Sequence, residues 1–166
     1  MLLCLIVFAL VCCGGSVPSE RVLSEMLKAS SSLPSGKTYT TDSSPGSGDH
    51  LSESLFSSMF FEDADVSVYG RIKTGAVWLS SGLFAAEAAV FECNSRRDLE
   101  EISDLCFRRI ENIKRLVNAN SDSLGISEAA KAKLAGAKVS IIGRYVIMVI
   151  DEHSDEMIEA AKEIIS

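Results

Sequence analysis

The stretch KVSIIGRYVIMVI, residues 138–150, predicts the clearest pair of strands in this chain and thereby decides its fold. β-Branched residues bracket the pair Gly143-Arg144, which is typical of a two-residue hairpin turn, and Gly143 can supply the positive φ of a type II′ turn. The segment 145–150 is apolar at nearly every position, so we expect both of its faces to be covered, as in a central strand. The pattern predicts a hairpin with strands at 138–142 and 145–150.

Two further strands are expected in the middle of the chain. The apolar run at 76–80 lies between Gly75 and Gly82, and the run at 87–93 ends directly before a helix start. Upstream, Asp65–Arg71 alternates apolar and polar residues, which predicts a short strand or an extended lead-in.

The N-terminal part of the chain contains a loop between two expected helices. Residues 30–48 are rich in Ser, Thr, Gly and Pro, which predicts a loop or hinge, with 37–41 as its only extended candidate. Apolar residues spaced three or four apart predict the flanking helices. These are 19–29, with Ser19 as N-cap, and 50–60, capped by Asp49.

The longest helix is expected at 95–118. Ser95 with Asp98 three positions later resembles a capping box, and apolar residues then recur along one face. Two shorter helices are expected at 127–135, capped by Ser127, and at 154–165, capped by Ser154.

These elements predict the α+β class. We expect a two-layer sandwich with a mainly antiparallel sheet of about four strands, packed by helices. The expected strands are 76–80, 87–93, 138–142 and 145–150, the packing helices are 95–118 and 154–165, and the N-terminal helices are 19–29 and 50–60.

The first fifteen residues predict export and lipid attachment. An apolar run of about ten residues suits the core of a signal peptide and is too short to span a bilayer. Leu10-Val11-Cys12-Cys13-Gly14 then resembles a bacterial lipobox, with Leu at −3 and Cys13 as the lipidated residue. Cys12 is less usual at −1 than Gly, Ala or Ser, and no Lys or Arg precedes the apolar run. A secreted protein with a conventionally cleaved signal and an uncleaved apolar anchor are the alternatives.

The chain is thus expected to consist of a leader, a tether and one folded unit. A length of 166 residues leaves room for about one domain after the leader. The expected boundaries are 1–12 for the signal peptide, 13–18 for the lipid-anchored tether, 19–48 for the N-terminal helix and loop, and 49–166 for the α+β domain.

The charge of the chain argues against one class of partner. The net charge is −7, whereas nucleic-acid binding depends on Lys and Arg that neutralise phosphates. We therefore expect no nucleic-acid partner, and an anionic membrane surface should repel the average surface of this protein.

Five cysteines divide between the leader and the folded domain. Cys4 and Cys12 would leave with the leader and Cys13 would carry lipid, so the domain keeps Cys93 and Cys106. These two could form one disulfide in an oxidising compartment, but we favour two separate buried thiols, because Cys106 falls on the apolar face of the predicted helix.

No residue pattern predicts catalysis, a cofactor or a metal site. The segment 70–75 has the glycine spacing of a phosphate-binding loop, but Ala76 occupies the position of the required Lys. His153 lies among acidic residues at 151–156 that could hold a divalent cation, although acidic residues are also usual in a first helical turn. Trp78 and Tyr145 are candidates for a binding face, with Trp78 more typical of a core.

The order of elements is similar to the DUF4358 family of small bacterial lipoproteins of unknown function. The residues that carry the resemblance are the lipobox, Ala86–Phe91, Arg108-Arg109-Ile110 and the hairpin Gly143-Arg144-Tyr145-Val146, over roughly 51–165. The resemblance implies a lipid-anchored protein on the extracytoplasmic face of a bacterial membrane, with an envelope protein as a candidate partner.

We expect such a protein to be a non-catalytic binding or accessory module of the envelope. The alternative is an enzyme that modifies envelope polymers, or a component of an envelope O-acylation system, because members of the family resemble components found near such enzymes. Cys13 is the one residue for which the sequence predicts a specific chemistry.

Overall fold

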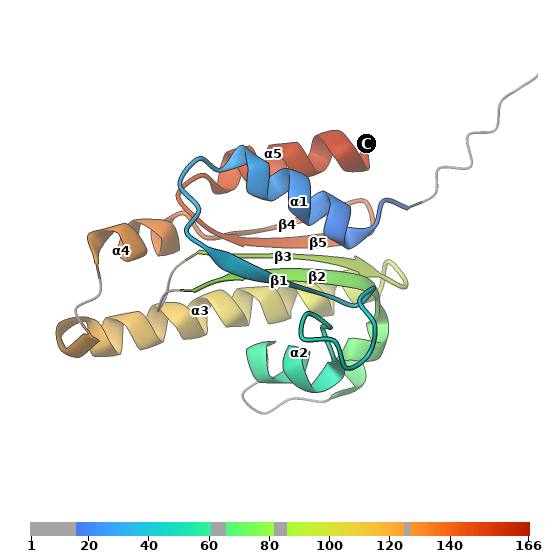
Figure 1. The fold of residues 1–166 in the computed structure, drawn as a ribbon, viewed down its shortest axis with the longest axis horizontal. Helices are drawn as coiled ribbons and strands as arrows, with labels where there is room; N and C mark the ends of the chain where they lie inside the picture. Colours follow the sequence, from blue (N-terminus) through green and yellow to red (C-terminus); the bar gives the residue numbers. More distant parts are fainter. Residues whose placement is uncertain (1–15, 61–65, 82–85, 125–126) are drawn as a thin grey trace, which may run out of the picture.

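A five-stranded antiparallel sheet forms the centre of the molecule (Figure 1). The structure is a computed structural model that describes residues 16–60, 66–81, 86–124 and 127–166. The sheet order is β1-β2-β3-β5-β4, and every neighbouring pair is antiparallel. The strands are β1 (Gly36–Thr40), β2 (Ile72–Ser80), β3 (Glu87–Cys93), β4 (Lys138–Ile142) and β5 (Tyr145–Ile150).

The hairpin predicted from 138–150 is confirmed. Ile142 pairs with Tyr145 across a two-residue turn, and Gly143 has a φ of 60°. All six residues of β5 are buried, because β5 lies between β3 and β4 and both of its faces are covered.

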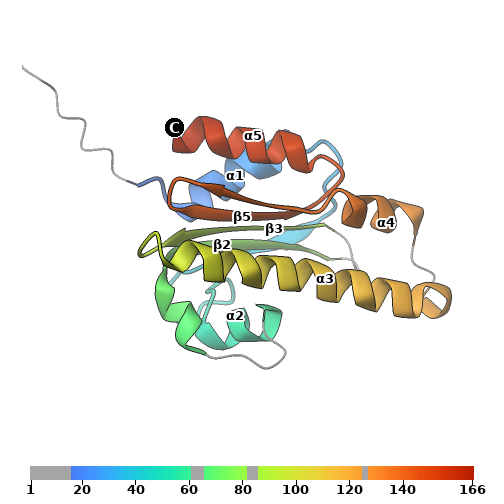
Figure 2. The ribbon, with the colours of Figure 1, turned by 180° about the vertical axis from the view of Figure 1, so that it is seen from behind.

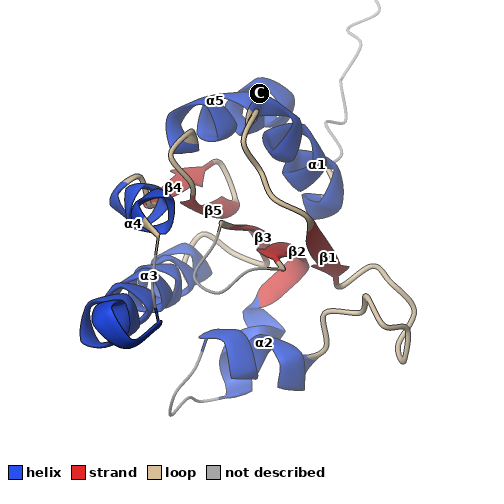
Figure 3. Cartoon of the chain, turned by 60° about the vertical axis from the view of Figure 1, so that its left-hand side comes forward, coloured by secondary structure: helices blue, strands red, loops and turns tan. Residues whose placement is uncertain are grey.

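Helices cover both faces of the sheet, so the fold has three layers (Figure 3). On one face α1 (Ser19–Ala29) and α5 (Ser154–Ile165) pack side by side over Trp78 and Ile147. On the other face α2 (Glu53–Phe60) and α3 (Asp98–Leu124) pack over Phe91. The α+β class is therefore confirmed, whereas the expected two layers are wrong, because the helix 19–29 covers the face opposite α3.

The sheet has one strand more than expected. β1 falls within the loop at 30–48, where 37–41 was the only extended candidate, and it pairs along β2 from Gly36 opposite Ser80 to Thr40 opposite Ala76. Gly36 is required there, because an added Cβ would lie 2.4 Å from Cε2 of Trp78.

The segment before β2 differs from the prediction. Val66–Arg71 forms a 3₁₀ helix instead of a strand, and β2 begins at Ile72 instead of residue 76. The hydroxyl of Tyr69 donates to the carbonyl oxygen of Leu51 at 2.7 Å, and Val68 is buried in the core. These contacts hold the 3₁₀ helix against the core.

The cap predicted at Ser127 is confirmed, and the predicted capping box of Ser95 and Asp98 forms in part, through the carboxylate of Asp98. Ser127 accepts a hydrogen bond from the amide of Ala130 at the start of α4 (Glu128–Ala135). The Asp98 carboxylate accepts from the amide of Ser95 at 2.9 Å and from its hydroxyl at 2.7 Å, so these residues interact as expected, although α3 begins at Asp98 and extends to Leu124.

Three other predicted caps are wrong. Ser19 and Ser154 lie inside their helices and are buried, so their hydroxyls donate to Thr74 and Gly136 carbonyl oxygens on neighbouring segments. Asp49 precedes α2 by too many residues, and the hydroxyl of Ser52 accepts from the amide of Leu55 instead.

We expect Gly143→Ala to destabilise the protein by about 1–2 kcal/mol, because a side chain in left-handed backbone costs that much. The nearest atom to an added Cβ is Cγ2 of Ile165 at 4.0 Å, so no clash contributes. Gly70→Ala is the control, since Gly70 has open space around it and no positive φ. Urea unfolding measures both, and equal losses would contradict the prediction.

Candidate functional site

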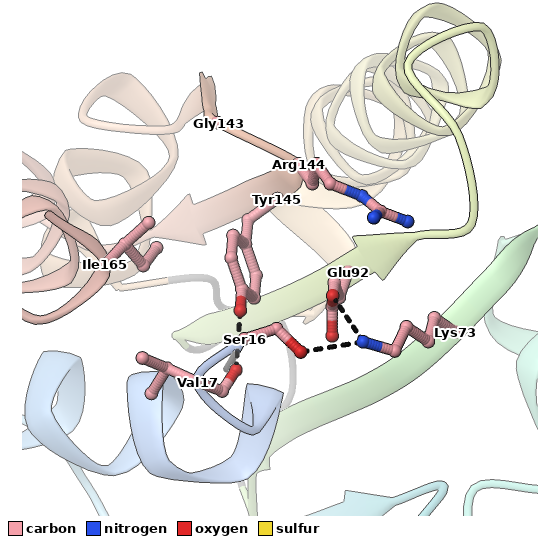
Figure 4. Close-up of a pocket in the computed structure, with 8 residues that line it drawn as sticks. All are labelled: Ser16, Val17, Lys73, Glu92, Gly143, Arg144, Tyr145 and Ile165. Atoms are coloured by element: carbon pink, nitrogen blue, oxygen red, sulfur yellow. Dashed lines mark hydrogen bonds and ion pairs between the residues drawn. The ribbon is translucent and has the colours of Figure 1, made fainter. Parts of the chain in front are cut away.

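An open pocket of about 470 Å³ lies at the end of the sheet where the described chain begins (Figure 4). It is bordered by the first residues before α1, by β2 and β3, by the β4–β5 turn and by the end of α5. The lining residues are Ser16, Val17, Lys73, Glu92, Gly143, Arg144, Tyr145 and Ile165.

A buried carboxylate lies at the base of this pocket. The side chain of Glu92 is 1% exposed, and its Oε1 accepts from Nζ of Lys73 at 2.9 Å. The hydroxyl of Thr74 donates to Oε2 at 3.4 Å. Burying a carboxylate is costly unless it is paired and hydrogen-bonded, and Lys73 supplies the neutralising charge.

An irregularity in β2 places Lys73 and Thr74 against the same carboxylate. Ile72 pairs with Cys93 and Thr74 pairs with Glu92, so Lys73 is an additional residue in β2 at this point. A bulge of this kind bends a strand and changes the direction of its side chains. The pairing of the half-exposed Lys73 with the buried Glu92 therefore depends on the bulge.

The N-terminal segment is fastened across one side of the pocket. The hydroxyl of Tyr145 donates to the carbonyl oxygen of Val17 at 2.7 Å, and Nζ of Lys73 donates to the Ser16 hydroxyl at 2.7 Å. Burial and the negative charge of Glu92 raise the pKa of Tyr145. The phenol consequently stays protonated at neutral pH and keeps its donor role.

Arg144 holds the turn after β3 against the hairpin. Its Nε and Nη2 donate to the carbonyl oxygen of Cys93 at 3.3 and 2.8 Å, and Nη2 also donates to that of Asn94. The residue is exposed, so its charge faces the solvent at the pocket rim. The guanidinium thus holds the turn in place, and its positive charge stays accessible at the rim of the pocket.

The other candidates from the sequence lie elsewhere. Cys13 lies outside the described residues. Trp78 is buried in the core, as favoured, whereas Tyr145 lines the pocket. Cys93 and Cys106 are separate, buried, free thiols. Burial, with the Asp98 charge as a smaller cause, raises the pKa of Cys93 to about 11, so this thiol is protonated and unreactive at neutral pH.

A second buried charge pair lies apart from the pocket. Asp151, which was weighed as a metal ligand, is completely buried and its Oδ2 accepts from Nζ of Lys133 at 2.8 Å. Its Oδ1 accepts from the Ser30 hydroxyl at 3.1 Å and from the amide of His153 at 2.9 Å. Within the described ranges, no group of His, Cys, Asp and Glu is arranged to hold a metal ion.

Comparison of the chain with protein-family models, curated protein sequences and solved structures gave no match. The resemblance to the DUF4358 family therefore stays a prediction. No helix in the described part of the chain is long and apolar enough to cross a bilayer.

Among the pocket residues, the sequence indicates only Tyr145 as a binding candidate, whereas Gly143 and Arg144 are predicted only as the hairpin turn. The buried Glu92 was a recognisable signal, because the apolar run at 87–93 contains a carboxylate that a strand buried on both faces has to neutralise. Its partner Lys73 carried no comparable signal.

Proposed function

We propose that this chain is a lipid-anchored extracytoplasmic protein that serves as a non-catalytic binding or accessory module of a bacterial cell envelope. The observation that carries the proposal is the sequence Leu10–Gly14, with Leu at −3 and Cys13 at +1, directly after an apolar run of signal-peptide length. Cys13 is the residue that would carry the lipid.

The position of the folded part supports this proposal. Ser16 and Val17 follow Cys13 by three and four positions, and both are hydrogen-bonded to side chains of the sheet. A lipid on Cys13 would therefore hold the domain close to the membrane, with the pocket beside the attachment point. A module held in this way would meet ligands or partners at the membrane surface.

The proposal predicts that cells fed an azide-bearing fatty acid label the wild-type protein and that Cys13→Ala abolishes the label. The Cys13→Ala protein should also leave the membrane fraction, because one lipidated residue supplies the anchor. Cys12→Ala is the matched control and should keep its label, since Ala is a usual residue at −1 of a lipobox.

Two results would overturn the anchor. One is a wild-type protein without label, and the other is a label that persists in Cys13→Ala while Cys12→Ala removes it. Fractionation in high salt accompanies the labelling, because a peripheral protein held by charge alone would be released.

A further inference from the structure

Basic side chains gather at the end of the molecule where the described chain begins, although the net charge of the chain is −7. The N-terminal segment, the β4–β5 turn and the connection from β3 to α3 lie at the same end in both opposite views (Figures 1 and 2). This end contains five basic residues, Arg71, Lys73, Arg96, Arg97 and Arg144, and four acidic residues of the same segments, Glu92, Asp98, Glu100 and Glu101. Five positive and four negative charges leave these segments at +1, whereas the whole chain carries −7.

Some of these cations are neutralised and others are not. Arg71 pairs with Glu101 and, at 3.9 Å, with Asp98, and Lys73 pairs with Glu92. Arg144 bonds only to backbone carbonyl oxygens, and no ion pair joins Arg96 or Arg97 to a carboxylate within the described residues. The exposed guanidinium groups of Arg96, Arg97 and Arg144 consequently lie outside the ion pairs of this end, so each can accept an anionic ligand without breaking one.

The pocket itself has an excess of one positive charge. Lys73 and Arg144 contribute two positive charges, and Glu92 contributes one negative charge. An ammonium group has three donors, and the Lys73 side chain, which uses two of them on Ser16 and Glu92, is 45% exposed. The charge balance suits a monoanion that accepts hydrogen bonds from Lys73 and Arg144.

The remaining wall of the pocket is partly apolar. Ile165, Val17 and the ring of Tyr145 border the space opposite the charged side chains (Figure 4). A ligand with one negative charge and a short carbon skeleton fits this combination. A phosphodiester has one negative charge near neutral pH, whereas a phosphate monoester carries up to two.

The proposed anchor would place the pocket within reach of such a group. Three residues span at most about 11 Å when extended, so a lipid on Cys13 would keep Ser16 within that distance of the attachment point. The headgroup layer on each side of a bilayer is roughly 5–8 Å thick. The pocket would thus lie at the depth of the lipid phosphates or directly above it.

We propose that this pocket binds the phosphodiester of an anionic phospholipid headgroup, with Lys73 and Arg144 as hydrogen-bond donors and Arg96 and Arg97 as the surrounding attractive charges. The membrane position rests on the proposed function, whereas the affinity for a phosphodiester belongs to the pocket. Basic residues near an anionic membrane surface contribute attraction that salt weakens.

The test uses the full chain, held in micelles of a neutral detergent and labelled for NMR. Soluble glycerophosphoglycerol is titrated first, and inorganic phosphate is titrated in a parallel sample. Shifts that saturate and are confined to Ser16, Lys73, Glu92 and residues 143–145 support the proposal. Nanodiscs of phosphatidylcholine, with or without phosphatidylglycerol, form the lipid arm and should produce the same shifts only when phosphatidylglycerol is present.

Substitutions test the individual donors. Arg144→Gln should weaken the phosphodiester about tenfold, which is the typical effect of losing one hydrogen bond to a charged group. Arg144 also donates to two backbone carbonyl oxygens, so its loss could disturb the turn. The double variant Lys73→Gln/Glu92→Gln is therefore tested as well, because it removes the charged donor Lys73 without leaving the Glu92 carboxylate unpaired. Arg108→Gln, an exposed change on α3, should leave the affinity unchanged.

Three results would overturn the proposal. They are the absence of saturable shifts with glycerophosphoglycerol, an equal loss of affinity in Arg108→Gln, and inorganic phosphate binding more tightly than the diester. None of them depends on labelling at Cys13, because the titrations in micelles measure ligand binding to the pocket and not attachment to a membrane. A failed anchor and a failed headgroup site are therefore distinguishable.

Discussion

Replacing Lys133 with alanine is expected to lower the free energy of unfolding by about 3–5 kcal/mol, the usual cost of removing one partner of a buried ion pair. The side chains of Lys133 and Asp151 are 11% and 0% exposed, and their charged atoms lie 2.8 Å apart. Without Lys133, the carboxylate keeps only neutral donors, the Ser30 hydroxyl and the amide of His153.

The control for this change is another lysine that pairs with a carboxylate. Lys162 pairs with Glu159 on the surface of α5, where both side chains are about half exposed or more. Lys162→Ala should cost a few tenths of a kcal/mol at most, because an exposed pair contributes little. Equal losses in urea unfolding would show that Lys133 is not a buried partner. Adding Asp151→Asn to Lys133→Ala should recover part of the loss.

The effect of Lys133→Ala should depend on pH. Burial raises the pKa of Asp151, but hydrogen bonds from Lys133, His153 and Ser30 and the Lys133 charge outweigh it, so the pKa lies below its ordinary value of 3.8. A lowered folded pKa stabilises the protein above the unfolded value, about 4, and this contribution is lost as the pH falls through the folded pKa. The difference between wild type and Lys133→Ala should therefore shrink below about pH 4, as urea unfolding from pH 7 to pH 3 will measure.

Phe91→Ala is expected to cost about 3–5 kcal/mol, a large share of the stability of an ordinary domain. The ring is completely buried and contacts Phe56 and Phe60 edge to face, with ring centroids 5.5 and 5.4 Å apart. Because these contacts attach α2 to the sheet, α2 should also exchange its amide hydrogens faster. Phe107 on α3 is 51% exposed and supplies the control.

Phe107→Ala should change the free energy of unfolding by less than about 0.5 kcal/mol, as surface substitutions usually do. Thermal unfolding and hydrogen exchange of both variants make the comparison. An α2 that stays fully protected in Phe91→Ala would contradict the role assigned to that ring.

The local parts of the fold could be predicted from the sequence, because their causes are local. Gly143 with β-branched neighbours predicts the hairpin, and Ser127 caps the helix that follows it directly. The N-cap roles predicted for Ser19 and Ser154 are wrong, because their hydroxyls donate to segments that only the tertiary fold brings near.

The polar strand β1 and the candidate site depend on distant residues. β1 is extended because it pairs with β2, some forty residues later in the chain. The pocket joins residues near 16, 73, 92, 144 and 165, which share no motif or spacing. Its ion pair of Lys73 and Glu92 requires a bulge in β2, and no residue type in β2 predicts that bulge. The lipobox, in contrast, is a contiguous motif and is readable without a structure.

The place of α1 affects the order in which the chain can fold. Its apolar side, Val22, Leu23 and Met26, packs on β2 and β3 and against Met157 and Ala161 of α5. A chain made or exported from its N-terminus therefore presents α1 more than a hundred residues before its partner helix α5 emerges. During that interval the side of α1 that α5 covers stays exposed, and transiently exposed apolar surface of this kind favours aggregation.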